Sequence, residues 1–524
     1  MEAVFRFLEK YRSYFLVLIC LIVGAYLRFH HIGLRTFWLD EASSATLIKY
    51  NFSDLWREIA QKDSCPAYLF FLKIWSLLFG DSEFALRSFS ATAGLLSIAA
   101  IYRLGKMLFG KTAGLWAGFL LSINYFGIFY AIQARPYSLA ILFSILSYYY
   151  FVKLIRNEKS ALNVILYIVV TAVGIYIHIW FFLILGSQIL YWLIKKAAKR
   201  SYFIFAIYPV FIILLSLPWA STLLRFGKNG ASDCYGPAKL SAFSETFNYF
   251  MFGSAAVYII FSLIVLASYF IGIKKEEEGD IVRYRLVEKT SGIKINENAY
   301  LLLNYLFFPL ISAWIISQFV PIYLTGRHEA VVLPAFILLV AGFWSTFPNK
   351  KIILAAALIL IALGIRSAEA DKQAINSYKI NDRTIARDLI NNMTGNDVII
   401  FTGLSRPSFD YYLPRVNTEN KKYLEISFPE EMEHHPAFQS IRIMNTKIDK
   451  ISFEADALIE KITNLKPSHI WIIFASGNPA SEILREKMDE KFKLIESTSF
   501  LDPETSAPQA DVSPLHFQYI LEYE

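Results

Sequence analysis

Apolar residues gather in long runs over the first two thirds of the chain, and short polar loops separate one run from the next. A helix needs about 20 consecutive, mostly apolar residues to cross a hydrocarbon core about 30 Å thick. By that measure the sequence predicts roughly eleven membrane spans, centred near Ile22, Leu95, Leu121, Ile145, Val169, Leu185, Ile212, Val265, Phe307, Leu338 and Ala357. The expected fold class is mainly α, with a polytopic helical membrane domain over residues 1–367.

The pattern changes after residue 368, where short apolar segments alternate with amphipathic ones. DVIIFTG, SHIWIIFAS and HFQYILEY are typical of strands, and TIARDLINNM, ADALIEKITNL and SEILREKMDEKF are typical of helices. This alternation predicts a small α/β domain over residues 368–524. The segment has neither GxGxxG nor GxxxxGK, so nucleotide binding has no support, and we expect a structural or acceptor-docking module.

Lys and Arg residues occupy every second loop, which indicates how the chain crosses the membrane, because cytoplasmic loops retain them. The N-terminus is then cytoplasmic, residues 30–82 form the first outer loop, and an odd number of spans makes the C-terminal domain extracytoplasmic. The composition agrees with a multi-pass protein, which we expect in a prokaryotic plasma membrane: 55% of residues are hydrophobic and only 18% charged. The net charge of +7 follows from the basic loops and predicts no nucleic-acid partner.

The first outer loop carries two adjacent acids, Asp40 and Glu41, in the segment FWLDEASSATLIKY. A carboxylate near apolar side chains at a membrane surface can have a raised pKa and act as a general base toward a hydroxyl acceptor. The competing interpretation is structural, because Asp before Glu-Ala-Ser-Ser-Ala is also a good helix N-cap. The dipeptide alone favours the N-cap.

Several motifs in order change that balance. They are FWLDEA, CPAYLFFLKIW, FGDSEFALRSFSATAG, YRLGKMLFGKTAGLWAGFLLSIN, YAIQARPYSL, YIHIW, PWASTLL and RHEAVVLPAF. Together they resemble the membrane-embedded glycosyltransferases of the GT-C type, in particular the protein O-mannosyltransferase and aminoarabinose-transferase families. The resemblance implies a glycosyltransferase that uses a polyprenyl-phosphate sugar as donor and a hydroxyl-bearing protein, lipid or glycan as acceptor. A mannosyltransferase is one candidate within it.

The same resemblance implies roles for individual residues. Asp40 would be the catalytic base, and Glu41 would position it or the acceptor. Arg327 would stabilise the phosphate leaving group, although an Arg at a helix end can also simply extend to the membrane surface. The remaining substrate-binding positions implied are Tyr68, Arg135, Tyr137 and His178. Tyr68 could instead anchor its helix, and His178 could be a hydrogen-bonded structural residue.

The sequence departs from the family pattern at two places. Gln133 stands where many relatives have an acid, so we predict no metal and no other cofactor, since an amide cannot share a divalent cation as a carboxylate does. Before Pro66, the residues Asp63, Ser64 and Cys65 replace the usual His-Pro or Lys-Pro. Cys65 and Cys234 both fall in outer loops, and whether they pair is open.

Two functions of other classes compete with sugar transfer. A transporter or flippase is compatible with a long apolar chain, but no pair of matching Gly/Pro-broken helices indicates an inverted repeat. A membrane scaffold with a decayed active site would also explain Gln133 and the Ser64-Cys65 pair. The sequence identifies neither the sugar, the polyprenol nor the acceptor.

Overall fold

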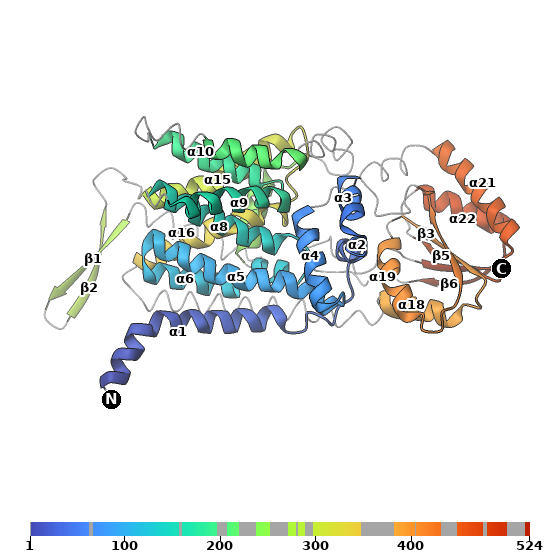
Figure 1. Cartoon of the computed structure of the whole chain (residues 1–524), viewed down its shortest axis with the longest axis horizontal. Coiled ribbons are helices and arrows are strands. Elements are labelled where there is room, and N and C mark those ends of the chain that lie inside the picture. Colours follow the sequence, from blue (N-terminus) through green and yellow to red (C-terminus); the bar gives the residue numbers. More distant parts are fainter. Residues whose placement is uncertain are drawn as a thin grey trace. The chain divides into compact units, whose positions relative to one another are not determined.

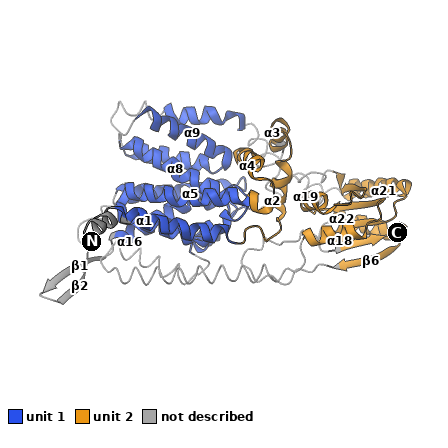
Figure 2. Cartoon of the chain, turned by 60° about the horizontal axis from the view of Figure 1, so that its bottom comes forward, with its two compact units in different colours: residues 1–30, 87–219, 237–369 blue, residues 31–86, 220–236, 370–524 orange. Residues whose placement is uncertain are grey.

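The structure of the chain is a computed structural model (Figure 1). It describes residues 2–61, 66–156, 160–195, 207–219, 237–251, 271–278, 281–288, 297–346, 382–403, 405–430, 448–474, 479–499 and 519–524. The chain divides into two compact units, which Figure 2 shows in two colours. Unit 1 comprises residues 1–30, 87–219 and 237–369, and unit 2 comprises residues 31–86, 220–236 and 370–524.

Unit 1 is built from apolar helices. They are α1 (Glu2–Phe29), α5 (Glu83–Phe109, most of which lies in this unit), α6 (Lys111–Ile123), α7 (Tyr125–Ala131), α8 (Tyr137–Ile155), α9 (Ala161–Ile177), α10 (Phe181–Ile194), a helix over Ile207–Trp219, α13 (Ser241–Phe250), α15 (Glu297–Ser317), the 3₁₀ helix η1 (His328–Val332) and α16 (Leu333–Thr346). The described part of this unit also contains an antiparallel hairpin of β1 (Ile271–Glu278) and β2 (Ile281–Glu288).

Each predicted span that falls on described residues coincides with one of these helices. Four of the described helical runs are long and apolar enough to cross a membrane: α5, α8, α15 and His328–Ser345. The pair α6 and α7, bent by 58°, would be a fifth. The spans predicted near Val265 and Ala357 lie outside the described residues, so the number of spans stays a prediction.

Helix pairing in unit 1 follows from these apolar surfaces: α8 packs against α9, α6 against α1 and α16, and α10 against α15. A buried arginine stabilises the bend between α6 and α7. The Arg28 guanidinium donates to the carbonyl oxygens of Leu121 and Ser122, each at 2.9 Å. These carbonyls belong to the last turn of α6, where no further helical N–H group follows. Arg28 therefore satisfies backbone groups that the bend leaves unpaired.

Unit 2 joins the first loop to the C-terminal part of the chain. The loop contributes α2 (Leu39–Leu47), α3 (Phe52–Gln61) and α4 (Pro66–Phe79). The C-terminal part contributes α18 (Asp382–Asn392), β3 (Asp397–Thr402), α19 (Arg406–Val416), β4 (Tyr423–Phe428), α21 (Ile448–Leu465), β5 (Ile470–Phe474), α22 (Pro479–Lys491), β6 (Leu494–Ser499) and β7 (Tyr519–Tyr523). The boundary predicted at 367/368 lies outside the described residues.

A five-stranded sheet of order β4-β3-β5-β7-β6 forms the centre of the C-terminal part. Strand β3 runs parallel to β4 and β5, whereas β7 runs antiparallel to β5 and β6. Alternate side chains point to opposite faces of a strand. Val398 and Ile400 therefore share one face, in one core cluster with residues of α21 and α22. On β3 the alternate residue Phe401 contacts Phe409 of α19, with ring centroids 5.6 Å apart.

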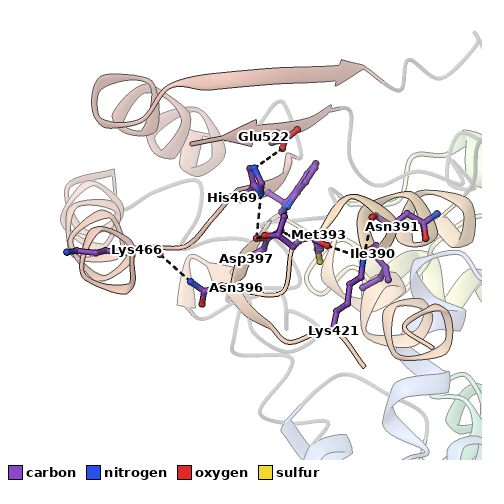
Figure 3. A network of polar contacts seen from close by, with 11 residues as sticks. Ile390, Asn391, Met393, Asn396, Asp397, Lys421, Lys466, His469 and Glu522 are labelled. Carbon is purple, nitrogen blue, oxygen red and sulfur yellow. Dashed lines mark hydrogen bonds and ion pairs between the residues drawn. The ribbon is translucent and has the colours of Figure 1, made fainter. Parts of the chain in front are cut away.

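A polar network lies where β3 and β5 begin (Figure 3). The buried Asp397 carboxylate accepts hydrogen bonds from the Thr394 N–H (3.1 Å) and the Trp471 indole N–H (3.2 Å). His469 lies between two carboxylates, 3.7 Å from Asp397 and 3.9 Å from Glu522. Nearby, the Lys421 ammonium donates to carbonyls at the end of α18, those of Ile390, Asn391 and Met393. The Lys421 contacts fix the chain just before β4 to the end of α18.

Asp382, the first residue of α18, makes the stability of unit 2 depend on pH. Its side chain is buried, and its Oδ1 atom has no hydrogen-bond partner among the described residues. Burial raises the pKa of Asp382 to about 7, whereas the pKa of an Asp in an unfolded chain is about 3.9. The folded state thus retains a proton that the unfolded chain releases. The resulting contribution to stability is fully present below about pH 4 and is lost as the pH rises through about 7.

We therefore expect Asp382→Asn to reduce the fall in stability between pH 5 and pH 7, which for the native Asp is up to about 1.4 kcal/mol per pH unit. The measurement is the apparent melting temperature of the full chain in detergent at both pH values. Asp388→Asn is the matched control, because Asp388 lies exposed on the same helix. A wild-type pH dependence in Asp382→Asn would contradict the assignment.

Candidate active site

The two predicted catalytic acids lie at the start of α2. This helix has Trp38 as its N-cap and begins at Leu39, so the interpretation of Asp40 as the N-cap residue is wrong. The capping carboxylate is that of Glu41, whose Oε2 accepts the Trp38 N–H at 3.4 Å. Glu41 is 1% exposed, whereas Asp40, in the first turn, is half-buried. The structure therefore gives Glu41 a structural contact and leaves Asp40 partly accessible.

The rest of the first loop fixes the far end of α2. The Lys73 ammonium on α4 donates to the carbonyl of Ile48, the C-cap residue, at 2.8 Å. A cation at this end of a helix satisfies a terminal carbonyl and interacts favourably with the helix dipole. Tyr68, also on α4, is 1% exposed, which favours the interpretation that it anchors its helix. Lys62, Asp63, Ser64, Cys65 and Cys234 lie outside the described residues.

The second predicted group of site residues begins in unit 1, at the turn between α7 and α8. The Arg135 N–H donates to the Gln133 carbonyl at 2.8 Å, which closes the turn. The Ser90 hydroxyl on α5 donates to the Arg135 carbonyl at 3.2 Å and fixes the turn to that helix. Gln133 itself is 2% exposed. Tyr137 follows as the first residue of α8.

Three rings in unit 1 contact one another in tilted and edge-on arrangements. We call them the imidazole cluster: Tyr137, His178 and His328. The ring centroids of His178 lie 6.1 Å from those of Tyr137 and 4.9 Å from those of His328. The Nδ1 atom of His178 accepts the Trp180 N–H at 3.2 Å. The Nδ1 atom of His328 lies 2.7 Å from the Ile322 carbonyl, which only a protonated nitrogen can bond.

Arg327 immediately precedes His328 on a tightly held turn. Gly326 has a φ of +86°, a conformation that favours glycine. The Glu329 carboxylate accepts the N–H groups of Gly326 (2.5 Å) and Arg327 (3.1 Å), and the Tyr130 hydroxyl donates to the Gly326 carbonyl. The half-buried Arg327 therefore extends from a rigid backbone.

Four of the predicted residues, Arg135, Tyr137, His178 and Arg327, belong to unit 1, whereas Asp40, Glu41 and Tyr68 belong to unit 2. Arg135 lies two residues before Tyr137, and Arg327 directly precedes His328, and the rings of both Tyr137 and His328 contact His178. Two arginines thus lie next to residues of the imidazole cluster in unit 1. Such a group can bind an anionic oxygen through N–H donors and positive charge.

Sequence reasoning missed His328, Glu329 and Tyr130. His328 and Glu329 follow Arg327 directly in the motif RHEAVV, so the motif itself could have pointed to them. Nothing in the local sequence around Tyr130 pointed to Gly326, which lies 196 positions further along the chain.

Residues 63–223 match the model of the family described as dolichyl-phosphate-mannose-protein mannosyltransferase. No curated protein matched the chain. Among solved structures, ArnT from Cupriavidus metallidurans matches with a TM-score of 0.53 and 11% identity over 97% of both chains, in the apo state and bound to undecaprenyl phosphate. Arabinofuranosyltransferase AftD from Mycobacteria matches with a TM-score of 0.50 and 12% identity, over 98% of this chain and 39% of AftD.

These matches confirm the resemblance inferred from the motifs. The family match covers the segment that contains Tyr68, Arg135, Tyr137 and His178. The likeness to ArnT extends over nearly the whole chain and shows a mainly helical, GT-C-like fold.

Proposed function

We propose that this GT-C-type chain transfers a glycosyl group from a polyprenyl-phosphate-linked sugar to a hydroxyl-bearing acceptor on the extracytoplasmic face of the membrane. The observation that carries the proposal is that Arg135 and Arg327 lie next to residues of the imidazole cluster in unit 1. The family match over residues 63–223 and the ArnT structure with undecaprenyl phosphate support a phosphate-linked lipid as the donor. The N-terminus is then cytoplasmic and the C-terminal domain extracytoplasmic.

The cationic group in unit 1 suits the departing half of the reaction. As the bond between the anomeric carbon and the phosphate oxygen breaks, negative charge develops on that oxygen. Arg327 can donate two parallel N–H bonds to a phosphate, a geometry that an ammonium cannot provide. Polyprenyl phosphate leaves with the electron pair of the broken bond.

Asp40 suits the attacking half of the reaction. Its carboxylate accepts the proton of the acceptor hydroxyl as the acceptor oxygen forms a bond to the anomeric carbon. A single displacement of this kind inverts the configuration at that carbon. The capping contact of Glu41 with Trp38 supports a role for Glu41 in holding the turn on which Asp40 lies.

The direct test is turnover by the purified full-length protein in lipid nanodiscs, with a radiolabelled polyprenyl-phosphate mannose as donor and a mixture of hydroxyl acceptors. Label in a product that no longer partitions with the lipid donor supports transfer. In proteoliposomes, movement of intact donor across the membrane would instead indicate a flippase. If the protein neither transfers nor moves any of several lipid-linked sugars, it is a scaffold.

A separate experiment identifies the donor. Mass spectrometry of a deletion strain would show which lipid-linked sugar accumulates.

Metal dependence gives a further prediction. Gln133 occupies the turn where many relatives have an acid, and the amide of Gln133 is a poor partner for a divalent cation. Within the described ranges, no three His, Cys, Asp or Glu side chains are arranged to hold a metal ion. We expect transfer rates with and without EDTA to agree within about twofold, since catalysis by charge stabilisation can rest on arginine. Complete loss with EDTA that added Mg²⁺ or Mn²⁺ reverses would show that Asp40 and Glu41 hold an ion without a third acid.

A further inference from the structure

The backbone just before α2 is held by a side chain from the far end of the sequence. The buried Tyr412 hydroxyl on α19 accepts the Phe37 N–H at 2.8 Å, within unit 2. Phe37 is fully buried and precedes Asp40 by three residues. Its ring also meets the ring of Tyr411 edge-on, with centroids 4.8 Å apart.

The same hydroxyl is oriented by a second contact. It donates to the Glu83 carboxylate at 3.0 Å, and that carboxylate also pairs with the Arg383 guanidinium of α18. Burial opposes the charge on Arg383, but its interactions with Glu83 and Tyr412 together raise the pKa of Arg383. Because a hydroxyl has a single proton, donation to Glu83 leaves the oxygen lone pairs to accept the Phe37 N–H. The ion pair thus determines which way the hydroxyl points.

We propose that Tyr412, oriented by the Glu83–Arg383 ion pair, is a positioning residue for the reaction, which sets the location of the Asp40 carboxylate through the backbone at Phe37. The inference rests on the proposed function. Its physical basis is that a general base acts only within hydrogen-bond reach of the proton it removes. A displacement of about 1 Å can lower a rate by roughly 10²-fold.

Three contacts hold the segment on both sides of Asp40. Tyr412 holds the backbone at Phe37, Glu41 holds the N–H of Trp38, and Lys73 holds the carbonyl of Ile48. Of these, only the Tyr412 contact comes from the C-terminal part of the chain. The C-terminal domain accordingly contributes to the reaction through α18 and α19, in addition to any acceptor that it binds.

The test compares two neighbouring tyrosines. Tyr412→Phe removes the hydroxyl that contacts Phe37, whereas Tyr411→Phe removes a hydroxyl that donates to the Asp81 carbonyl at 2.8 Å. Both side chains are 1% exposed on the same helix, so their burial is matched. For Tyr412→Phe we expect kcat to fall roughly tenfold or more, with the donor KM within about twofold of the wild type. For Tyr411→Phe we expect kcat near the wild-type value.

The ion pair is tested separately by Arg383→Ala and Arg383→Lys. The lysine keeps the charge beside Glu83, so we expect it to recover part of the kcat that alanine loses. Arg415→Ala, which breaks the ion pair with Asp81, is the control. Melting temperatures of all variants show whether the chain is still folded.

The outcomes separate this inference from the proposed function. A wild-type chain with no transfer activity would overturn both. An active wild type with full kcat in Tyr412→Phe would overturn the positioning role alone. The positioning role would also be overturned if both tyrosine variants lost kcat and both lost melting temperature to the same extent. The effect would then be general destabilisation.

Discussion

Replacement of Asp40 by asparagine is expected to lower sugar transfer at least about 10²-fold, with expression and donor binding close to normal. The amide is nearly the same size as the carboxylate but cannot take a proton from the acceptor, so the loss falls on the transition state. The helix should persist, because its capping contact is made by Glu41. The measurement is kcat with a radiolabelled lipid-linked donor, beside donor binding by the same protein.

Asp54→Asn is the control for Asp40, because Asp54 is a half-buried acid in the same loop that pairs with Arg57. It should leave kcat unchanged. Retention of more than about a tenth of wild-type activity in Asp40→Asn would remove Asp40 from the role of general base.

The second large effect is expected at Arg327. Arg327→Ala should weaken use of the donor by about 10²-fold or more in kcat/KM, the usual scale when one group that stabilises developing charge is removed. Arg327→Lys should restore only part of that loss, because an ammonium keeps the charge but lacks the planar pair of donors. Steady-state kinetics against donor concentration measure both variants.

Arg156→Ala is the matched control in unit 1. Arg156 is an arginine at the end of α8, where it contacts the Met107 carbonyl and the Asn298 side chain. Its loss should leave donor kinetics unchanged. Wild-type kinetics in Arg327→Ala would instead assign Arg327 to the membrane surface.

The elements of the fold that sequence reasoning found are those with strong local patterns. The long apolar runs gave the helices of unit 1, and the segments DVIIFTG, SHIWIIFAS and HFQYILEY contain β3, β5 and β7. Helix α19 was missed because RPSFDYYLPRV contains two prolines and lacks a clear helical period. Strands β4 and β6 were missed as well, since each is short and carries charged or polar residues.

The candidate site shows the same limit. Motif order was enough to select Arg135, Tyr137, His178 and Arg327, which the structure places in unit 1, within or next to the imidazole cluster. Local spacing was misleading at Asp40, which is not the N-cap of its helix, because the backbone already turns into α2 one residue earlier. The ion pair between Glu83 and Arg383 joins residues 300 positions apart. Contacts at such separations leave no local pattern.

The bond between Phe37 and Tyr412 joins residues 375 positions apart, and this separation has a consequence for how the protein is made. A ribosome that adds about 5–20 residues per second needs roughly 20–75 s to travel from one to the other. During that interval the segment with Asp40 is already synthesised, yet the helix that holds it has not emerged. A chain that stops before α19 would contain every residue named in the candidate active site and still lack this support. The segment that carries Asp40 therefore matures late in biosynthesis, only after translation has passed α19 in the final third of the polypeptide.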